Sequence, residues 1–246
     1  MLEEMAKPLD RARFGPRNRL LAALLPEGLV SFRTHLERVP LVEGRILFEA
    51  NEPITRVYFV EAGVVALVTV FRNGTSTVSA IVGREGLVGV GALLGNDAAF
   101  GRHLVQMAGS ALTMEASRFR DALRASPRLR TICQDYARAF FGQVLQCIAC
   151  HTIHTLEQRC ARSLLMIHDR SNGDTLALKQ EFLAQMLGER RSTTAAVTRT
   201  LQKAELIRYC QGDIRVVDRA GLESAACECY GIDRERHERL LPGAFA

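Results

Sequence analysis

The chain has 246 residues, of which 48% are hydrophobic and 24% are charged, and its 32 basic and 27 acidic side chains give a formal net charge of +5. This composition excludes a largely disordered or collagen-like chain, and the small basic excess is compatible with a nucleic-acid partner. The longest apolar runs, such as Val64–Val68, fall far short of the about 20 residues that span a bilayer. No secretory signal is visible at the N-terminus. We therefore expect a cytoplasmic protein of one large or two small domains.

The seven cysteines are an odd number in a long chain of intracellular character, so we expect free thiols rather than a disulfide framework. The segment Cys147–His151 has the literal spacing of a haem-attachment motif, but it falls within a predicted helix, and we expect buried structural thiols there. Cys227 and Cys229 have no second pair close in the sequence, and we therefore predict neither a metal site nor a cofactor. For Cys147 and Cys150, a redox or metal switch that also uses His151 or His154 is the alternative.

The hydrophobic period of the N-terminal half changes near Leu41. Before it, apolar residues at helical spacing predict a helical lead-in, formed by Leu20, Leu21, Leu24, Leu25, Leu29, Phe32, Leu36 and Val39. After it, short apolar runs between Gly, Pro and Asn predict strands at Arg45–Phe48, Val57–Val60, Val64–Phe71, Thr75–Val82 and His103–Met107. Asn73 and Gly74 predict a two-residue hairpin turn, in which both residues take positive φ.

A long helix is predicted from Pro127 to about Ile153, because apolar residues recur there every three or four positions. Its apolar stripe consists of Leu129, Ile132, Tyr136, Phe140, Val144, Cys147 and Ile148. A stripe of this length in a helix that joins two domains favours pairing with a second copy of the helix; packing on its own domain is the alternative. The spacing of a capping box at Thr155–Gln158 predicts that a new helix begins there.

The segment Phe182–Leu201 has the pattern of a helix-turn-helix. A short apolar helix ends at Gly188, where a left-handed residue lets the chain turn sharply, and a polar, cationic second helix follows. Such a helix fits the major groove of DNA, where Arg, Ser and Thr side chains bind bases and phosphates. The candidate DNA-binding residues are Arg190, Arg191, Ser192, Thr193, Thr194 and Arg199. A predicted hairpin over Leu206–Val217 adds a wing; the alternative is an ordinary helical hairpin with a solvated basic face.

On these residues the chain resembles the CRP/FNR family of bacterial transcription regulators over nearly its whole length, most specifically over Leu183–Ile207. The resemblance implies an α+β fold in three parts: a jelly-roll-like, cyclic-nucleotide-binding-like β-roll with its helical lead-in over residues 1–127, a dimerisation helix over 128–154 and a winged helix-turn-helix domain over 155–246. Arg191 falls where the family places its main guanine-reading arginine. Ser192 and Ala196 stand at two further base-reading positions, where members of the family have other residues. The resemblance therefore implies that the chain binds an operator, but one whose sequence differs from the operator of those members.

The β-roll of this family can bind a cyclic nucleotide, and the residues that correspond to the effector pocket are Gly89, Gly91 and Arg102. Val90, however, stands where the family places the glutamate that holds the ribose. Val144 and Leu145 stand where nucleotide-binding members have hydroxyl residues that meet the base across the dimer. A nucleotide in such a pocket would lose water without gaining polar partners. We therefore do not expect a cyclic nucleotide as the effector.

The sequence contains no Gly-x-Ser-x-Gly, Walker or His-Glu-x-x-His pattern, and we predict that the protein is not an enzyme. We predict a homodimeric transcription regulator that reads a palindromic operator through the major groove. Its expected partners are double-stranded DNA, a second copy of the chain and, as the resemblance implies, RNA polymerase, but no membrane. The alternative is an effector-binding regulatory module that acts through a protein partner and has a vestigial DNA-binding domain.

Overall fold

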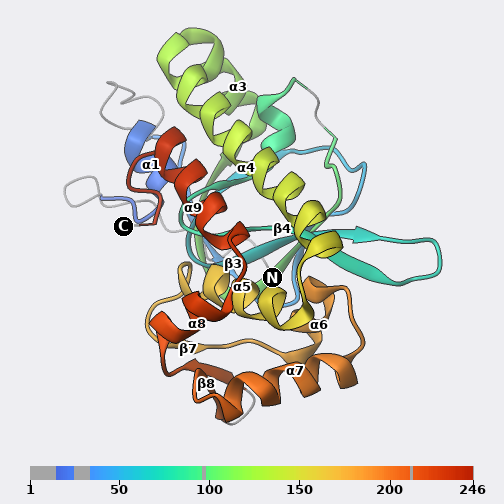
Figure 1. The fold of residues 1–246 in the computed structure, drawn as a ribbon. Helices are drawn as coiled ribbons and strands as arrows, with labels where there is room; N and C mark the ends of the chain where they lie inside the picture. Colours follow the sequence, from blue (N-terminus) through green and yellow to red (C-terminus); the bar gives the residue numbers. More distant parts are fainter. Residues whose placement is uncertain (1–14, 25–33, 96–97, 211–212, 246) are drawn as a thin grey trace.

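The computed structural model describes residues 15–24, 34–95, 98–210 and 213–245. They form an N-terminal sheet domain, a long helix that crosses the molecule, and a mostly helical C-terminal domain with a small sheet of its own (Figure 1). This arrangement confirms the predicted α+β fold class. Within the described ranges, no helix combines the length and the apolar character that a membrane span needs.

The larger sheet holds the core of the N-terminal domain. Its strands are antiparallel and run in the order β1 (Glu37–Leu41), β6 (Arg102–Glu115), β3 (Arg56–Val70) and β4 (Ser76–Val82), with β2 (Ile46–Phe48) paired to β6 and β5 (Leu87–Val88) paired to β3. The short 3-10 helix η2 (Val90–Leu93) follows β5, and helix α3 (Ala116–Ala125) follows β6. Phe59 of β3 and Phe119 of α3 are fully buried, with ring centroids 6.0 Å apart in an edge-to-face contact. This contact holds α3 against the sheet.

Strand β3 joins two segments that the sequence predicts as separate strands, Val57–Val60 and Val64–Phe71. The interruption is a bulge, because the register against β6 shifts there without ending the pairing. Gly63 has a φ of +89°, and a Cβ atom at this position would lie 2.5 Å from Met107 O. A Cβ atom at Gly109 would lie 2.0 Å from Ala62 O. Glycine at both positions therefore permits a close approach of the two backbones, and β6 likewise continues through Gly109.

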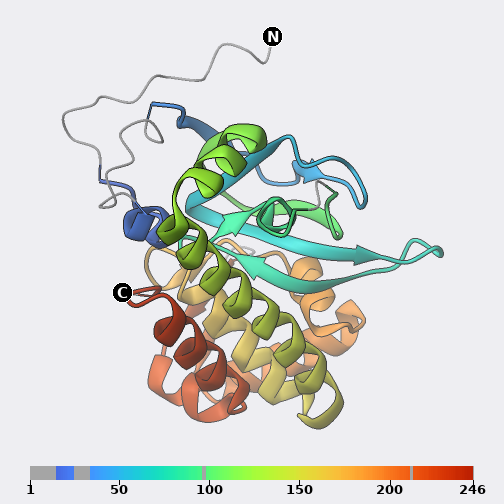
Figure 2. The same ribbon diagram turned by 90° about the horizontal axis from the view of Figure 1, so that it is seen from above.

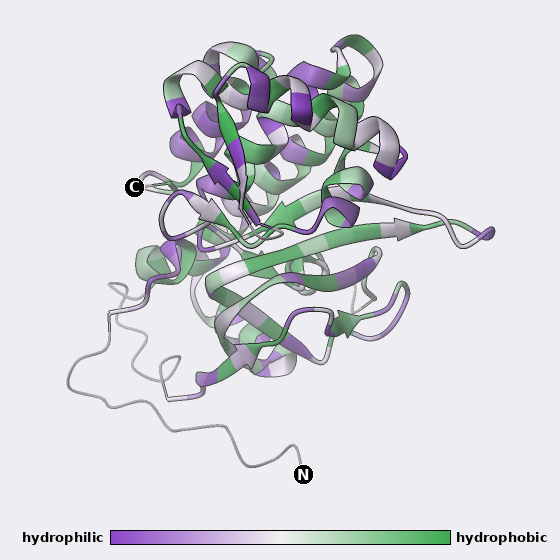
Figure 3. Cartoon of the chain, turned by 90° about the horizontal axis from the view of Figure 1, so that it is seen from below, coloured by the Kyte–Doolittle hydropathy of each residue, from purple (hydrophilic) through white to green (hydrophobic). Residues whose placement is uncertain are grey.

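The hairpin between β3 and β4 projects from the body of the molecule, and its tip is hydrophilic (Figure 1 and Figure 3). The Phe71 N–H donates to Thr75 O at 2.8 Å, and the Gly74 N–H donates to Phe71 O at 2.9 Å. Gly74 has a φ of +82°, whereas Asn73 has a negative φ. The Asn73 side chain accepts a hydrogen bond from the Thr75 N–H at 3.0 Å. The predicted two-residue turn is therefore wrong: the loop is longer and needs only one left-handed residue.

The predicted helical lead-in is confirmed only in part. Helix α1 (Arg19–Leu24) is present and buries its leucines, while Leu25, Leu29 and Phe32 lie outside the described residues. The continuation of the helical spacing to Val39 is wrong, because Val39 lies in β1, opposite Ala111 of β6. Pairing along the whole of β1 satisfies the backbone groups of this segment, so a long-range partner overrides the local spacing.

Helix α4 (Pro127–Ile153) begins and ends where the sequence predicts. Its N-cap is Ser126, whose hydroxyl accepts a hydrogen bond from the Leu129 N–H at 3.2 Å, and this satisfies a donor that the first turn leaves free. Tyr136 is fully buried and donates its hydroxyl to Leu87 O at 3.1 Å. Burial raises the pKa of this phenol, so it remains a donor.

The apolar stripe from which dimerisation is predicted packs mostly on the chain's own sheet domain. Leu129 is fully buried and Phe140 is 6% exposed, so this face of α4 is not free for a second chain. An adjacent row is exposed, and it consists of Phe141 and Leu145 together with Ile148 from the end of the predicted stripe, with exposed fractions of 61%, 55% and 61%. Positions separated by four and three residues lie on one face of a helix. These three residues are called the exposed stripe of α4 below.

The C-terminal domain begins with helix α5 (Leu156–His168), and its predicted capping box is confirmed. The Gln158 N–H donates to Thr155 Oγ1 at 3.4 Å, and the Thr155 N–H donates to Gln158 Oε1 at 3.1 Å. The elements that follow are β7 (Thr175–Leu176), α6 (Gln180–Leu187), α7 (Arg191–Lys203), β8 (Ile207–Cys210), β9 (Asp213–Val216), α8 (Arg219–Ala225) and α9 (Cys229–Leu240). Strands β8 and β9 pair as the predicted hairpin and form a small sheet with β7.

The C-terminal domain packs directly on the larger sheet. Apolar side chains of β3, β4, α5 and α6 share one buried cluster. Thr77 Oγ1 donates to Gln185 O at 3.2 Å, and Gln185 Nε2 donates to Ser76 Oγ at 3.3 Å. These two hydrogen bonds join α6 to the start of β4, so side-chain contacts fix the position of the helix-turn-helix relative to the sheet.

A buried ion pair crosses the same interface. Glu85 Oε1, before β5, lies 2.8 Å from Arg170 Nη2, after α5, and both side chains are 2% exposed. The same carboxylate oxygen accepts a hydrogen bond from the Gly83 N–H at 3.1 Å. A Cβ atom at Gly83 would lie 2.6 Å from Arg170 Cγ, and one at Gly86 would lie 2.3 Å from the Tyr136 hydroxyl. The glycines of this loop therefore make room for two buried polar side chains.

The C-terminal helix α9 lies side by side with α4 (Figure 1 and Figure 2). Gly142 permits this approach, because a Cβ atom there would lie 2.4 Å from Arg236 Cδ of α9. A second buried ion pair, Arg162 Nη2 to Asp233 Oδ2 at 2.7 Å, joins α5 to α9. Helix α9 thus covers a side of α4 that the larger sheet does not reach, and it brings the end of the chain back to the domain junction.

Candidate nucleic-acid interface

The turn between α6 and α7 has the geometry that its glycine predicts. Gly188 is the C-cap of α6, with φ of +65° and ψ of +31°. The Gly188 N–H donates to Gln185 O at 3.3 Å, and the Glu189 N–H donates to Ala184 O at 3.0 Å. These bonds close the last turn of α6. Arg190 is then the N-cap of α7, so the two helices are joined by three residues, as a helix-turn-helix requires.

Helix α7 has one buried and one exposed side. The buried side consists of Thr194, Val197, Thr198 and Leu201, none of which is more than 6% exposed. The exposed side consists of Arg191, Ser192, Ala196, Arg199, Thr200 and Lys203, and Thr193 is half-buried beside it. The apolar side holds the helix on its domain, and the other side offers cationic and hydroxyl groups to a partner.

The first turn of α7 carries the arginine that the sequence predicts as a base reader. Arg191 is exposed, and its guanidinium forms an ion pair with Glu181 in the first turn of α6. An exposed pair of this kind is worth about 0–1 kcal/mol. Arg191 is thus available to exchange the carboxylate for a bidentate contact with guanine. Arg190 and Ser192 flank it and are exposed as well.

Thr194 is a correction to the predicted set of DNA-binding residues. The residue is fully buried, and its hydroxyl has no hydrogen-bond partner among the described residues. Its carbonyl accepts a hydrogen bond from Thr198 Oγ1 at 3.0 Å. Thr194 follows Arg191 by three residues, and at the helical rotation of this segment that position faces the domain core. Thr194 therefore packs α7 onto the domain and does not reach a partner at the surface.

Arg199 lies on the exposed side of α7, at nearly the same angular position as Ser192, seven residues earlier. It follows Arg191 by eight residues, which is about 12 Å along the helix axis. The N-terminal residues of a recognition helix contact base edges. In a helix placed in the major groove, a cation two turns further along would lie near the phosphates at the edge of the groove.

The β8–β9 hairpin contributes two more cations that sequence reasoning did not single out. Arg208 and Arg215 are direct cross-strand partners, and both are exposed. Like charges directly opposite each other destabilise a pair of strands, so an anionic partner such as a DNA backbone would relieve this repulsion. The signal in the sequence is the register of the hairpin, which places these two arginines opposite each other.

The residues predicted for the effector pocket make contacts within the chain. Arg102 Nη2 lies 2.9 Å from Glu49 Oε1, and Arg102 Nε donates to Glu49 Oε2 at 2.9 Å. Gly89 is the N-cap of η2, with a φ of +99°, and Gly91 is buried within η2. Val90 is only 4% exposed. A phosphate at Arg102 would therefore have to displace a carboxylate that already occupies two of the guanidinium donors.

Two protein-family models match this chain, one in its N-terminal half and one in its C-terminal half. The family model of the cyclic nucleotide-binding domain matches residues 38–126, and that of the Crp-like helix-turn-helix domain matches residues 158–225. No curated protein sequence gives a significant match.

Solved structures share the fold over most of their length. FixK2 from Bradyrhizobium japonicum superposes with a TM-score of 0.69 and 14% sequence identity, over 78% of this chain and 98% of that one. TTHB099, a CRP-family transcriptional regulator from Thermus thermophilus, superposes with a TM-score of 0.63 and 20% identity, over 76% of this chain and 96% of that one. TTHA1359, a CRP/FNR-family regulator from the same organism, superposes with a TM-score of 0.61 and 20% identity, over 77% of this chain and 98% of that one. At these identities the likeness concerns the fold.

The sheet domain, the long helix and the helix-turn-helix with its exposed cationic helix define a DNA-binding transcription regulator. Its two family matches together span more than half of the chain. The chain belongs to the CRP/FNR family of transcription regulators.

Proposed function

We propose that the protein is a homodimer that reads a palindromic operator, with one α7 in the major groove of each half-site. The observation that carries this proposal is the exposed, cationic N-terminal turn of α7. The residues proposed to contact DNA are Arg190, Arg191, Ser192, Thr193 and Arg199, with Arg208 and Arg215 of the wing on the phosphates. The proposed units are a sheet domain over residues 1–127, a dimerisation helix over 128–154 and a DNA-binding domain over 155–246.

The proposed dimer forms through the exposed stripe of α4. Phe141, Leu145 and Ile148 are more than half exposed, and exposed apolar side chains in one row indicate a contact surface. Their spacing of four and three residues is that of the seam between two paired helices. Two copies joined in this way would present two recognition helices to successive turns of one DNA face.

We expect Arg191→Ala to cost about 1–3 kcal/mol on the operator, confined to one symmetric base pair in each half-site, because a bidentate contact to guanine would be lost. Arg199→Ala should weaken binding to all duplexes alike. It should also reduce the slope of log affinity against log salt concentration by about one per chain. The operator is first selected from random duplexes with the wild-type protein, and affinities are then measured by fluorescence anisotropy at several salt concentrations.

The matched control is Arg124→Ala. The Arg124 side chain is 76% exposed, and it belongs to α3, far along the chain from α7. This variant should bind like the wild type. Equal losses on operator and random DNA for Arg191→Ala would contradict a base-reading role. Failure of the wild type to bind any duplex in a salt-dependent manner would favour the alternative of a module that acts through a protein partner.

We also propose that neither cyclic AMP nor cyclic GMP is the effector. Val90 offers no acceptor to a ribose, and Glu49 already holds Arg102. Titration calorimetry on the purified protein should therefore detect no binding of either nucleotide at micromolar concentrations. Micromolar affinity, about 8 kcal/mol of binding free energy, that Arg102→Ala abolishes would contradict this proposal.

On the basis of family membership, we further propose a cytoplasmic location, RNA polymerase as a protein partner and no catalytic activity of the chain's own.

A further inference from the structure

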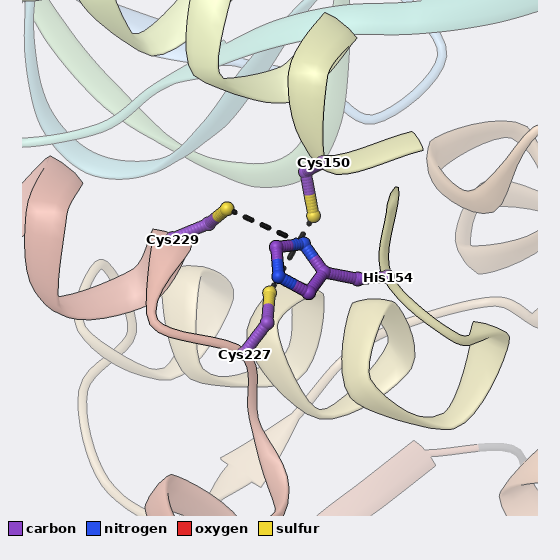
Figure 4. A group of neighbouring side chains, drawn as sticks. All are labelled: Cys150, His154, Cys227 and Cys229. Atoms are coloured by element: carbon purple, nitrogen blue, oxygen red, sulfur yellow. Dashed lines mark hydrogen bonds between the residues drawn. The ribbon is translucent and has the colours of Figure 1, made fainter. Parts of the chain in front are cut away.

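Four metal-ligating side chains meet at the junction of α4 with the C-terminal domain (Figure 4). They are Cys150 in the last turn of α4, His154 directly after it, Cys227 between α8 and α9, and Cys229 at the start of α9. Their ligand atoms all lie within 4.8 Å of one another. Cys150 Sγ is 3.5 Å from Cys227 Sγ, and Cys229 Sγ is 3.6 Å from His154 Nδ1. The three cysteines are at most 4% exposed.

The surrounding polar groups orient these ligands. His154 Nε2 lies 3.0 Å from Glu228 Oε2. A carboxylate at Nε2 favours the tautomer that carries its proton there, so the lone pair of Nδ1 faces the sulfurs. Gln146 Nε2 donates to Cys229 Sγ at 3.1 Å. A carboxylate behind a histidine and an N–H donor to a sulfur are typical of the environment of a metal site.

The distances fit a single tetrahedral ion. With Zn–S bonds of about 2.3 Å, two sulfurs of a tetrahedral site lie about 3.8 Å apart, and a sulfur and a nitrogen slightly less. A cluster of several irons would spread its ligands over more than one metal ion, and these four atoms are too close together for that.

We propose that Cys150, His154, Cys227 and Cys229 bind one Zn²⁺ ion per chain. Three thiolates and one imidazole complete a tetrahedron, and a site with four protein ligands has no open position for a substrate. The ion is therefore structural. This proposal departs from the expectation from the sequence that the chain has no metal site.

The position of the site gives the ion a defined role. Cys150 and His154 belong to the end of α4, whereas Cys227 and Cys229 belong to the segment that leads from α8 into α9 within the C-terminal domain. A bound ion would cross-link these two segments directly beside residues 154–155, where α4 gives way to α5. It would hold the helix-turn-helix at a fixed orientation to the proposed dimerisation helix.

The first test uses the unmodified wild-type protein. Elemental analysis after purification without added metal should find one zinc per chain. After removal of zinc by a chelator under reducing conditions, titration with Co²⁺ should saturate at one ion per chain, with thiolate-to-cobalt charge-transfer absorption and the strong visible bands of a tetrahedral ion. Loss of zinc should also lower the melting temperature, and added zinc should restore it.

The second test uses variants with a matched control. Cys227→Ser, Cys229→Ser and His154→Ala should each lower the zinc content and the cobalt absorption at least tenfold. Cys160→Ser replaces an equally buried cysteine of α5 outside the cluster and should leave both at the wild-type value. Wild-type protein that binds neither ion would overturn the proposal. So would the absorption of an iron–sulfur cluster, or a Cys150–Cys227 disulfide found by mass spectrometry in protein purified without oxidant.

Discussion

Replacement of Arg170 by methionine is expected to lower the free energy of unfolding by about 3–5 kcal/mol, because it leaves the buried carboxylate of Glu85 without its counter-charge. Both side chains are 2% exposed, so water cannot take the place of the missing partner. Arg170 also donates to Met166 O at 2.8 Å and lies over the ring of Phe245, 5.3 Å from its centroid. Urea denaturation followed by circular dichroism measures the change.

Two further variants separate the ion pair from a general loss of packing. Glu85→Gln combined with Arg170→Met removes both charges but keeps an oxygen that can accept the Gly83 N–H, so the double variant should lose less stability than Arg170→Met alone. Arg124→Met removes one partner of an exposed pair with Asp121, 76% and 71% exposed, and should change stability by less than about 1 kcal/mol. If Arg170→Met is as mild as Arg124→Met, the buried pair does not hold the two domains together.

The variant Leu145→Asp is expected to convert the proposed dimer into monomers. A charge in the middle of the exposed stripe of α4 would be buried opposite its own symmetry mate, which is strongly unfavourable. Light scattering should then report 27.2 kDa in place of twice that mass. The affinity for a palindromic operator should fall by about 10²–10⁴-fold, because the two half-sites would no longer be bound as one unit.

The control for this variant is Val42→Asp, which places the same charge at a residue that is 57% exposed on the turn between β1 and β2. It should keep the dimer mass and the operator affinity of the wild type. A wild-type protein that is monomeric at micromolar concentration would contradict the dimer. So would a Leu145→Asp protein with unchanged mass, because α4 would then use another face.

The parts of the fold that could be predicted from the sequence are those set by neighbouring residues. The capping box at Thr155–Gln158, the glycine that ends α6 and the start of α4 at Pro127 each depend on contacts within one helical turn. Strand β1, the bulge at Gly63 and the cover of α4 by α9 depend on partners far along the chain. No local spacing encodes such partners, so the spacing of the apolar stripe of α4 cannot distinguish a second chain from the sheet that covers it.

The candidate sites differ in the same way. The residues proposed to contact DNA from α7 and its N-cap follow one another along one helix, so their sequence order predicts them, and the error at Thr194 is a matter of helical rotation. Arg208 and Arg215 depend instead on the register of the β8–β9 hairpin. The four residues of the proposed zinc site come from segments more than 70 positions apart: Cys150 and Cys227 are separated by 77. The spacing of Cys227 and Cys229 alone is too weak to predict a metal site. It becomes informative only once the fold places the start of α9 beside the end of α4.

If Arg191 reads a base as proposed, its ion pair with Glu181 makes operator recognition an exchange of partners. In the absence of DNA the guanidinium is paired with the Glu181 carboxylate, so the contact with a base gains its own free energy less the about 0–1 kcal/mol of that exposed pair. A guanine that offers two acceptors would then displace the carboxylate more readily than a base that offers one acceptor. Salt screens the exposed pair as well as the phosphates. Ionic strength should therefore alter how well the protein distinguishes sequences, in addition to how tightly it binds them.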